Sequence, residues 1–196
     1  MKGIINISTL SYLLHHCKSQ NRYCKARLFA TKTYNLAGVS DTNSPSVQIN
    51  TLTTGHAFST DLPKYMGGED TAPQPVELLL GSLIGCTQAT AIFVGKNMIP
   101  RIFIQKMEFD IHGRRNDRGA LDMLPITKDS NFPEIESRLN NVTGVIRIHA
   151  VDKKGIKINL SESEISLLAQ HTEKRCPVAN MMIASGCNMN ITWINA

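Results

Sequence analysis

The sequence predicts an α+β protein, and three features carry that prediction. A long apolar run, residues 76–94, follows Pro75 and contains no residue that breaks a helix other than glycine. An amphipathic pattern over residues 161–174 predicts a second helix. Apolar residues that alternate with polar ones predict strands in three separate stretches, 102–112, 142–151 and 189–193. Helices and strands in separate stretches are typical of an α+β fold in which helices pack on antiparallel strands.

Residues 1–33 have the composition of a targeting segment. The first 40 residues carry six basic side chains and no acidic one, and residues 27–31 (RLFAT) look like a processing site for import into a mitochondrion. We therefore expect a targeting extension over 1–33 and one domain over 34–196. The expected location is the mitochondrial matrix or a related organelle. An unstructured basic extension on a cytoplasmic protein is the alternative.

The rest of the chain argues against nucleic-acid binding and against a metal centre. Of the 21 basic side chains, 15 lie beyond residue 40 and meet 16 acidic ones, so the net charge of +5 belongs to the N-terminus. The five cysteines form no Cys-x-x-Cys pair, and their odd number suits a reducing compartment. The set His171, Cys176 and Cys187 is not spaced like a zinc motif. No metal or cofactor is expected.

Short strands and loops are predicted before the long helix. Residues 35–45 have the composition of a linker. Apolar residues alternate over 47–52 and again over 56–60, which predicts a β-hairpin. Residues 63–71 contain Gly-Gly, but no Lys-Ser or Lys-Thr follows, so a turn is expected and not a phosphate site.

The long apolar helix is the element around which we expect the fold to form. Pro75 suits the first helical position, and apolar residues on every face predict burial. The run is too short and too often interrupted by polar residues for a membrane span. It carries one carboxylate, Glu77, and one thiol, Cys86, nine residues or about 13 Å apart along the axis. Each residue also has an ordinary structural explanation. Glu77 could simply be an acid that stabilises the first turn of the helix, and Cys86 could be a small apolar side chain in the core.

A polar segment separates the two central strands. In strand 102–112, Met107, Phe109 and Ile111 share one face. Residues 113–141 are predicted to form a long loop, with a helical turn over 134–139.

Two helices are predicted near the C-terminus. Ser161 and Glu164 form a capping box at the start of the first, and Pro177 starts the second, which ends at Gly186. Cys176 falls at the N-cap of the second helix, beside two basic residues, Lys174 and Arg175. This environment is expected to stabilise a thiolate. His171 could tune Cys176 or cap the first helix, and Cys187 is expected in the core.

Two segments and the spacing between them resemble the OsmC superfamily, which includes the organic hydroperoxide resistance proteins. They are a Pro-x-Glu-Leu-Leu-(x)6-Cys helix ending at Cys86, and Glu-Lys-x-Cys-Pro-Val around Cys176. The resemblance covers roughly residue 46 to the C-terminus. It implies antiparallel sheets packed around two central helices in an intertwined homodimer, with active sites at the subunit interface.

The resemblance also implies thiol-dependent reduction of organic hydroperoxides. Cys86 would attack the peroxide and become a sulfenic acid, and Cys176 would condense with it to an intramolecular disulfide. Glu77 would be the catalytic acid of the helix, and a dithiol of the lipoyl type is one expected reductant. An apolar lining would favour alkyl peroxides over hydrogen peroxide, with these residues expected in it: Leu79, Leu83, Phe93 and Met181.

Two departures from the peroxidase branches keep an alternative open. In those branches the acid follows the proline directly, where Val76 stands here, so that Glu77 is rotated by about 100°. They also carry an arginine on an early strand, whereas here none lies between Arg27 and Arg101. Lys64 or a later arginine would have to replace it. The alternative is a non-enzymatic protein of this fold that binds a small apolar or thiol-reactive ligand.

Overall fold

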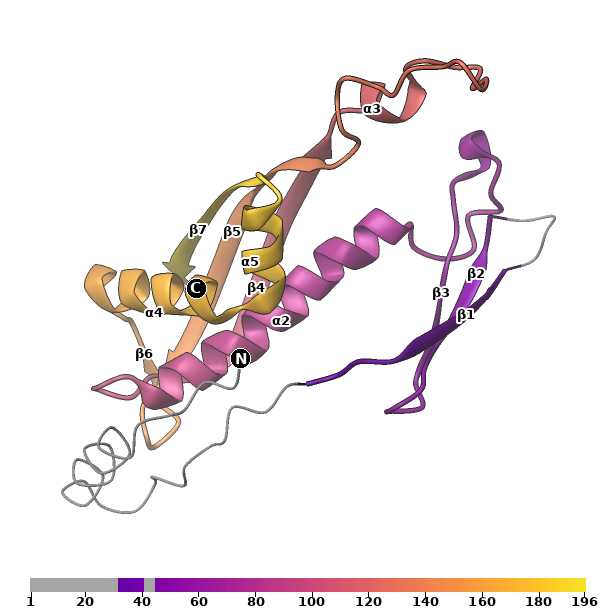
Figure 1. The fold of residues 1–196 in the computed structure, drawn as a ribbon. Helices are drawn as coiled ribbons and strands as arrows, with labels where there is room; N and C mark the ends of the chain where they lie inside the picture. Colours follow the sequence, from indigo (N-terminus) through magenta and orange to yellow (C-terminus); the bar gives the residue numbers. More distant parts are fainter. Residues whose placement is uncertain (1–31, 41–44) are drawn as a thin grey trace, which may run out of the picture. The chain divides into compact units, whose positions relative to one another are not determined.

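The computed structural model describes residues 32–40 and 45–196. The predicted targeting segment, 1–33, lies almost wholly outside these residues and stays a prediction, as does a single domain over 34–196. The chain divides into two compact units, a small N-terminal one and a larger one that holds the helices and the main sheet. Figure 1 labels the elements of both.

The N-terminal sheet has three strands in the order β1–β2–β3: Leu36–Ser40, Val47–Thr51 and Ala57–Thr60. The predicted hairpin is therefore present. It turns at Gly55, whose φ of 71° favours glycine, and Thr51 closes the turn through its amide, which donates to the His56 carbonyl at 2.8 Å. The linker predicted over 35–45 was wrong for β1, because pairing with β2 stabilises a strand whose side chains are all exposed.

One buried carboxylate organises the loop between β3 and the long helix. Asp61 is fully buried, and both of its oxygens accept hydrogen bonds, from the amides of Leu62, Glu69 and Thr71 and from the Thr71 hydroxyl. These bonds, those from Thr71 first, hold the pKa of Asp61 below its usual value. The loop includes a short 3-10 helix, η1 (Lys64–Met66).

The predicted helix is α2 (Pro75–Asn97), with proline at its first position as expected. Glu77 and Gln74 form a capping box, in which the Glu77 carboxylate accepts from the Gln74 amide at 2.8 Å. With 23 residues, α2 is long and apolar enough in composition to cross a membrane, contrary to the length expected from the sequence. Core helices meet the same criterion, and α2 packs against β4, α4 and α5.

Only one side of α2 is buried within the chain, which corrects the prediction of a wholly buried helix. Its buried residues recur at helical spacing, while Leu79 and Phe93 are 43% and 49% exposed. The buried side faces the sheet and the two C-terminal helices, and within the larger unit the remaining apolar surface of α2 is partly exposed. The buried residues of α2 are Leu83, Thr87, Ala91, Val94 and Gly95.

The main sheet is built on β5 (Leu139–Val151). It pairs antiparallel with β4 (Phe103–Arg115) along one edge and with the short β6 (Lys157–Ile158) along the other. β7 (Asn188–Asn195) pairs with β5 along the same edge as β6. The β5–β7 pair is parallel, a difference from the all-antiparallel sheets expected. The chain reaches β7 only after crossing one sheet face through two helices, and such crossovers connect parallel strands.

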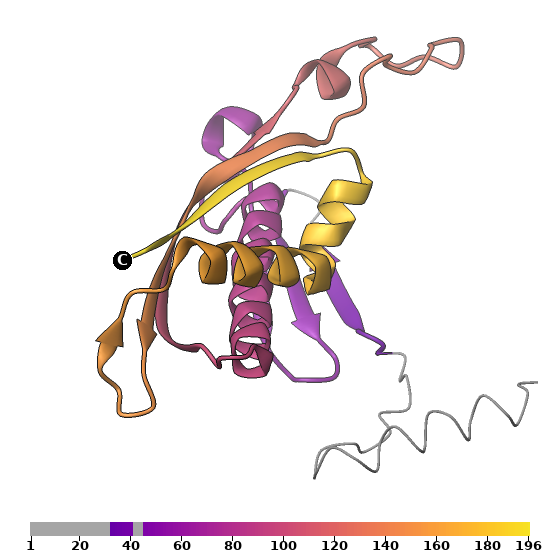
Figure 2. The ribbon, with the colours of Figure 1, turned by 90° about the vertical axis from the view of Figure 1, so that its left-hand side faces the viewer.

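Those helices are α4 (Glu162–Arg175) and α5 (Pro177–Ala184). Figures 1 and 2 show them on the same face of the sheet as α2, with α4 crossing α2. The capping box of Ser161 and Glu164 starts α4 as predicted. Between helices and sheet lies an apolar cluster of buried residues: Val94, Ile102, Ile146, Ile148, Ala150, Leu160 and Leu168.

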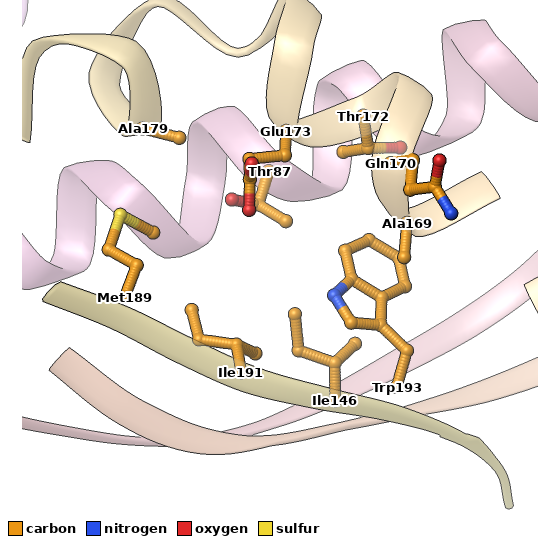
Figure 3. Close-up of a pocket in the computed structure, with 10 residues that line it drawn as sticks. All are labelled: Thr87, Ile146, Ala169, Gln170, Thr172, Glu173, Ala179, Met189, Ile191 and Trp193. Carbon is orange, nitrogen blue, oxygen red and sulfur yellow. The ribbon is translucent and has the colours of Figure 1, made fainter. Parts of the chain in front are cut away.

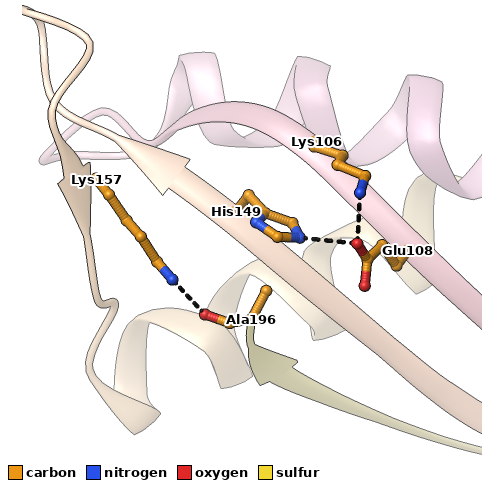
Figure 4. Close-up of polar contacts among 5 residues, drawn as sticks. All are labelled: Lys106, Glu108, His149, Lys157 and Ala196. Carbon is orange, nitrogen blue, oxygen red and sulfur yellow. Dashed lines mark hydrogen bonds and ion pairs between the residues drawn. The ribbon is translucent and has the colours of Figure 1, made fainter.

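The opposite face of the sheet is polar. Glu108 on β4 pairs with Lys106 at 2.5 Å and with His149 of β5 at 3.2 Å (Figure 4). Nearby, the Lys157 ammonium donates to the Ala196 carbonyl at 2.7 Å and ties β6 to the last residue. This alternation of apolar and polar faces follows directly from the period of two in β4 and β5.

The helical turn predicted over 134–139 was wrong. The segment between β4 and β5 instead carries a short helix, α3 (Arg118–Leu121), and β5 already begins at Leu139. An Arg118–Asp122 ion pair spans this turn at 3.3 Å.

Candidate active site at two cysteines

The structure brings Cys86 and Cys176 together. Cys86 lies half-buried on α2 and Cys176 is only 1% exposed, and both belong to one apolar cluster with Leu83, Ala179 and Met182. Both are free thiols, and they lie close enough for Cys86 to influence the pKa of Cys176. Two residues 90 positions apart in the chain thus form a dithiol site inside a single protomer.

Cys176 occupies the junction of the two C-terminal helices, as predicted. It is the C-cap of α4 and the N-cap of α5, where its sulfur accepts from the Ala179 amide at 3.5 Å. Asn180 holds the junction, because its side-chain amide donates to the carbonyls of Cys176, Glu173 and Lys174 at 2.8, 3.1 and 3.2 Å. Asn180 was not predicted, since these bonds depend on the angle between the helices.

The expected stabilisation of a Cys176 thiolate was wrong. Burial raises the pKa of the Cys176 thiol, and the neighbouring Cys86 thiol raises it further. The Ala179 amide and the Thr87 hydroxyl lower it without reversing the shift. Arg175 does not help, because its exposed guanidinium bonds to His171 Nδ1 at 2.7 Å. His171 therefore interacts with Arg175 on the surface. Cys176 therefore keeps its proton more firmly than an ordinary cysteine.

Glu77 does not join the two cysteines within one chain. It is exposed and caps the start of its own helix. Nine residues correspond to two and a half turns, so Glu77 and Cys86 lie on opposite sides of α2. The carboxylate of one protomer is therefore remote from the thiol pair of the same protomer.

Of the predicted apolar lining, only Leu83 lies against the cysteines. Leu79, Phe93 and Met181 are on the surface of the chain, with Met181 70% exposed. They cannot line a pocket within a single protomer.

The structure contains a cavity that the sequence did not predict. It has a volume of about 140 Å³ and lies between α2, α4 and the sheet (Figure 3). Neither cysteine lines it, although Thr87 and Ala179, which both interact with Cys176, do. No local motif signals it, because its walls come from five elements, α2, β5, α4, α5 and β7. The lining residues are Thr87, Ile146, Ala169, Gln170, Thr172, Glu173, Ala179, Met189, Ile191 and Trp193.

Cys187 is a core residue, as expected. It is 5% exposed, and its thiol donates to the Asn188 carbonyl. Burial raises the pKa of Cys187, and the guanidinium of Arg138 offsets part of this. Across the described residues, no three His, Cys, Asp or Glu side chains converge as a metal site would require.

A profile of the OsmC-like protein family matches residues 68–192. No curated protein sequence matches the chain. Among solved structures, an OsmC-like protein from Mycoplasma pneumoniae is 21% identical, with a TM-score of 0.60 over 85% of this chain and 99% of that one.

Two further structures have the same fold at lower identity. An organic hydroperoxide resistance protein OsmC from Legionella pneumophila is 16% identical, with a TM-score of 0.56 over 85% of this chain and 98% of that chain. The organic hydroperoxide resistance protein OhrB of Bacillus subtilis is 12% identical, with a TM-score of 0.53 over 85% and 100%. At these identities the likeness establishes the fold, and the predicted α+β, OsmC-like architecture is confirmed.

Proposed function

The chain belongs to the OsmC-like protein family, and from this premise we propose that it reduces organic hydroperoxides through Cys86 and Cys176. The observation that carries the proposal is the thiol pair, in which a half-buried Cys86 lies directly beside a buried Cys176. Solved relatives that are named organic hydroperoxide resistance proteins support it. The role in the cell would be protection against oxidative stress.

The proposed reaction has three steps. The Cys86 thiolate attacks the distal peroxide oxygen, the O–O bond breaks, and the alkoxide leaves as an alcohol after taking up a proton. Cys86 is then a sulfenic acid. The Cys176 sulfur attacks the Cys86 sulfur, and water leaves as the disulfide forms. An external dithiol, the lipoyl type being our candidate, reduces the disulfide by exchange and becomes oxidised itself.

The different surroundings of the two thiols support this division of roles. Cys86 is the more accessible sulfur, and access is a requirement for the attacking thiol. Cys176 is shielded from peroxide, retains its proton and is in contact with Cys86, so it is placed to condense with a sulfenic acid formed there.

Mass spectrometry after one equivalent of alkyl hydroperoxide tests the proposal. Wild type should lose two thiols and gain a Cys86–Cys176 disulfide. Cys176→Ser should stop at a Cys86 sulfenic acid and then over-oxidise. Cys187→Ser is the matched control and should behave like wild type. Peroxide consumption by Cys86→Ser at the wild-type rate would refute the assignment.

We further propose a homodimer in which α2 of one protomer packs against a second copy. The support is the partly exposed apolar side of α2, which includes Leu79 and Phe93. Because Glu77 points away from its own Cys86, a catalytic role for it requires this second copy. Light scattering on residues 34–196 tests the dimer, and a stable monomer at micromolar concentration would contradict it.

For localisation we propose the mitochondrial matrix or a related organelle, on the composition of residues 1–33 alone. Residues 1–40 fused to a fluorescent reporter should direct it to the organelle in a eukaryotic cell. A diffuse cytosolic signal would support the cytoplasmic alternative.

One observation favours the alternative function, a non-enzymatic ligand-binding protein. In the described part of the chain, no lysine or arginine forms a hydrogen bond or ion pair with the sulfur of Cys86 or Cys176. Without a nearby cation to favour the thiolate, which is the nucleophile, a cysteine generally reacts slowly at neutral pH. Turnover of alkyl hydroperoxide with a dithiol reductant distinguishes the two functions, because only the enzyme consumes peroxide repeatedly.

A further inference from the structure

The cavity between α4 and the sheet has an apolar floor and one charged residue in its wall. Ile146, Met189, Ile191 and Trp193 supply the floor, from two neighbouring strands. Glu173 and Thr87 approach from the helices on the other side, and Figure 3 shows Glu173 reaching toward the same space as the indole nitrogen of Trp193. Neither reacting cysteine contributes to this wall, so the cavity is separate from the thiol pair.

The charge of Glu173 is unmatched. Its side chain is half-buried, and within the described part of the chain its carboxylate forms no hydrogen bond or ion pair. The basic neighbours in sequence do not compensate it, since Arg175 is engaged with His171 on the surface. A cation bound in the cavity would give this carboxylate a partner of opposite charge. The Thr172 hydroxyl, fully buried in the same wall, also lacks a partner among the described residues.

From these observations we propose that the cavity binds a small organic ammonium ion. The Glu173 carboxylate would accept hydrogen bonds from the ammonium group, and the Trp193 ring would contribute a cation–π contact. The apolar floor would hold a short alkyl stem. Anionic ligands would be repelled by Glu173, and neutral ones would leave its charge unmatched.

The size of the cavity limits the ligand to a few carbon atoms. A volume of about 140 Å³ is close to that of an engineered cavity of about 150 Å³ that accepts benzene. n-Butylammonium, with five non-hydrogen atoms, is a suitable probe. The same group could come from a free amine or from a lysine side chain, and Nα-acetyl-lysine amide serves to distinguish these sources.

The only tryptophan of the chain lies in the cavity wall, so its fluorescence reports binding directly. We expect n-butylammonium to change Trp193 emission saturably, and to bind about tenfold or more tightly than n-butanol or butyrate. Glu173→Gln should weaken n-butylammonium binding about tenfold and leave n-butanol binding nearly unchanged. Glu134→Gln, at an exposed position between β4 and β5 and outside the cavity, is the control and should bind like wild type. Equal thermal midpoints establish that both variants are folded.

The inference does not depend on the proposed peroxidase function, because the readout involves neither thiols nor peroxide. Binding of the lysine derivative as tightly as n-butylammonium would support the site and identify a lysine side chain as its source. No saturable emission change, equal affinity for n-butanol, or undiminished n-butylammonium binding by Glu173→Gln would each overturn the proposal.

Discussion

Oxidation of the thiol pair should stabilise the protein strongly, because the two cysteines are far apart in sequence. A Cys86–Cys176 disulfide would close a loop of about 90 residues, for which the chain-entropy relation gives about 4.6 kcal/mol at 25 °C. The thiols are already neighbours in the reduced structure, so the disulfide should form with little strain in the folded state. Little strain energy should therefore be subtracted from this value. For a chain of this size, 4.6 kcal/mol corresponds to a rise in Tm of roughly 9–18 °C.

Urea unfolding of oxidised and reduced protein, at one protein concentration, measures this difference. The oxidised form should show a higher midpoint, and adding a strong dithiol should return it to the reduced value. Cys176→Ser treated with the same oxidant is the control and should show no such rise. Oxidised wild type that unfolds at or below the reduced midpoint, with the disulfide confirmed by mass, would refute the reasoning that the thiols are preorganised.

Three further predictions concern stability. The folded-state pKa of Cys176 lies above the unfolded value of about 9.0, so reduced wild type should lose stability as pH rises above about 9. Cys176→Ser should lose less stability over the same pH range, and Tm measures both. The folded-state pKa of Asp61 lies below 3.8, so its contribution should be present above pH 3.8 and be lost as pH falls through the folded-state value; Asp61→Asn should flatten this acid dependence in the same melts. Gly144→Ala should destabilise by about 1–3 kcal/mol in urea, because the new Cβ would lie 2.1 Å from the Asp110 carbonyl oxygen of β4.

The elements that local pattern determines were predicted closely. Pro75, the capping box at Ser161 and the Cys176-Pro177 step each define a helix end through backbone chemistry within a few residues, and each helix begins where expected. Alternation likewise placed β4 and β5, since a period of two reflects the two faces of a sheet. Local pattern does not show which strand another strand pairs with. β1 was missed because its stability comes from pairing with β2.

The burial of α2 shows a second limit of sequence reasoning. Apolar residues on all sides predict that a helix is covered, but not by which chain. The protomer covers the side that carries Leu83 and Ala91 and leaves Leu79 and Phe93 in contact with solvent. Packing within the protomer therefore explains the apolar residues on one side of α2 and leaves those on the other side unexplained. A second copy is the proposed partner for the other side.

The protonation state of Cys176 depends on two opposing effects whose relative size cannot be predicted from the sequence. At Cys176 the helix N-terminus favours the thiolate and burial favours the thiol, and both effects are real in the structure. The N-cap contribution is visible in the sequence, because it needs only Pro177 and the next turn. The burial contribution comes from Leu83, Val142 and Met182, residues brought in from three different elements. Burial outweighs the cap, so the buried thiol stays protonated and the accessible thiol of Cys86 is left as the one suited to meet a peroxide first.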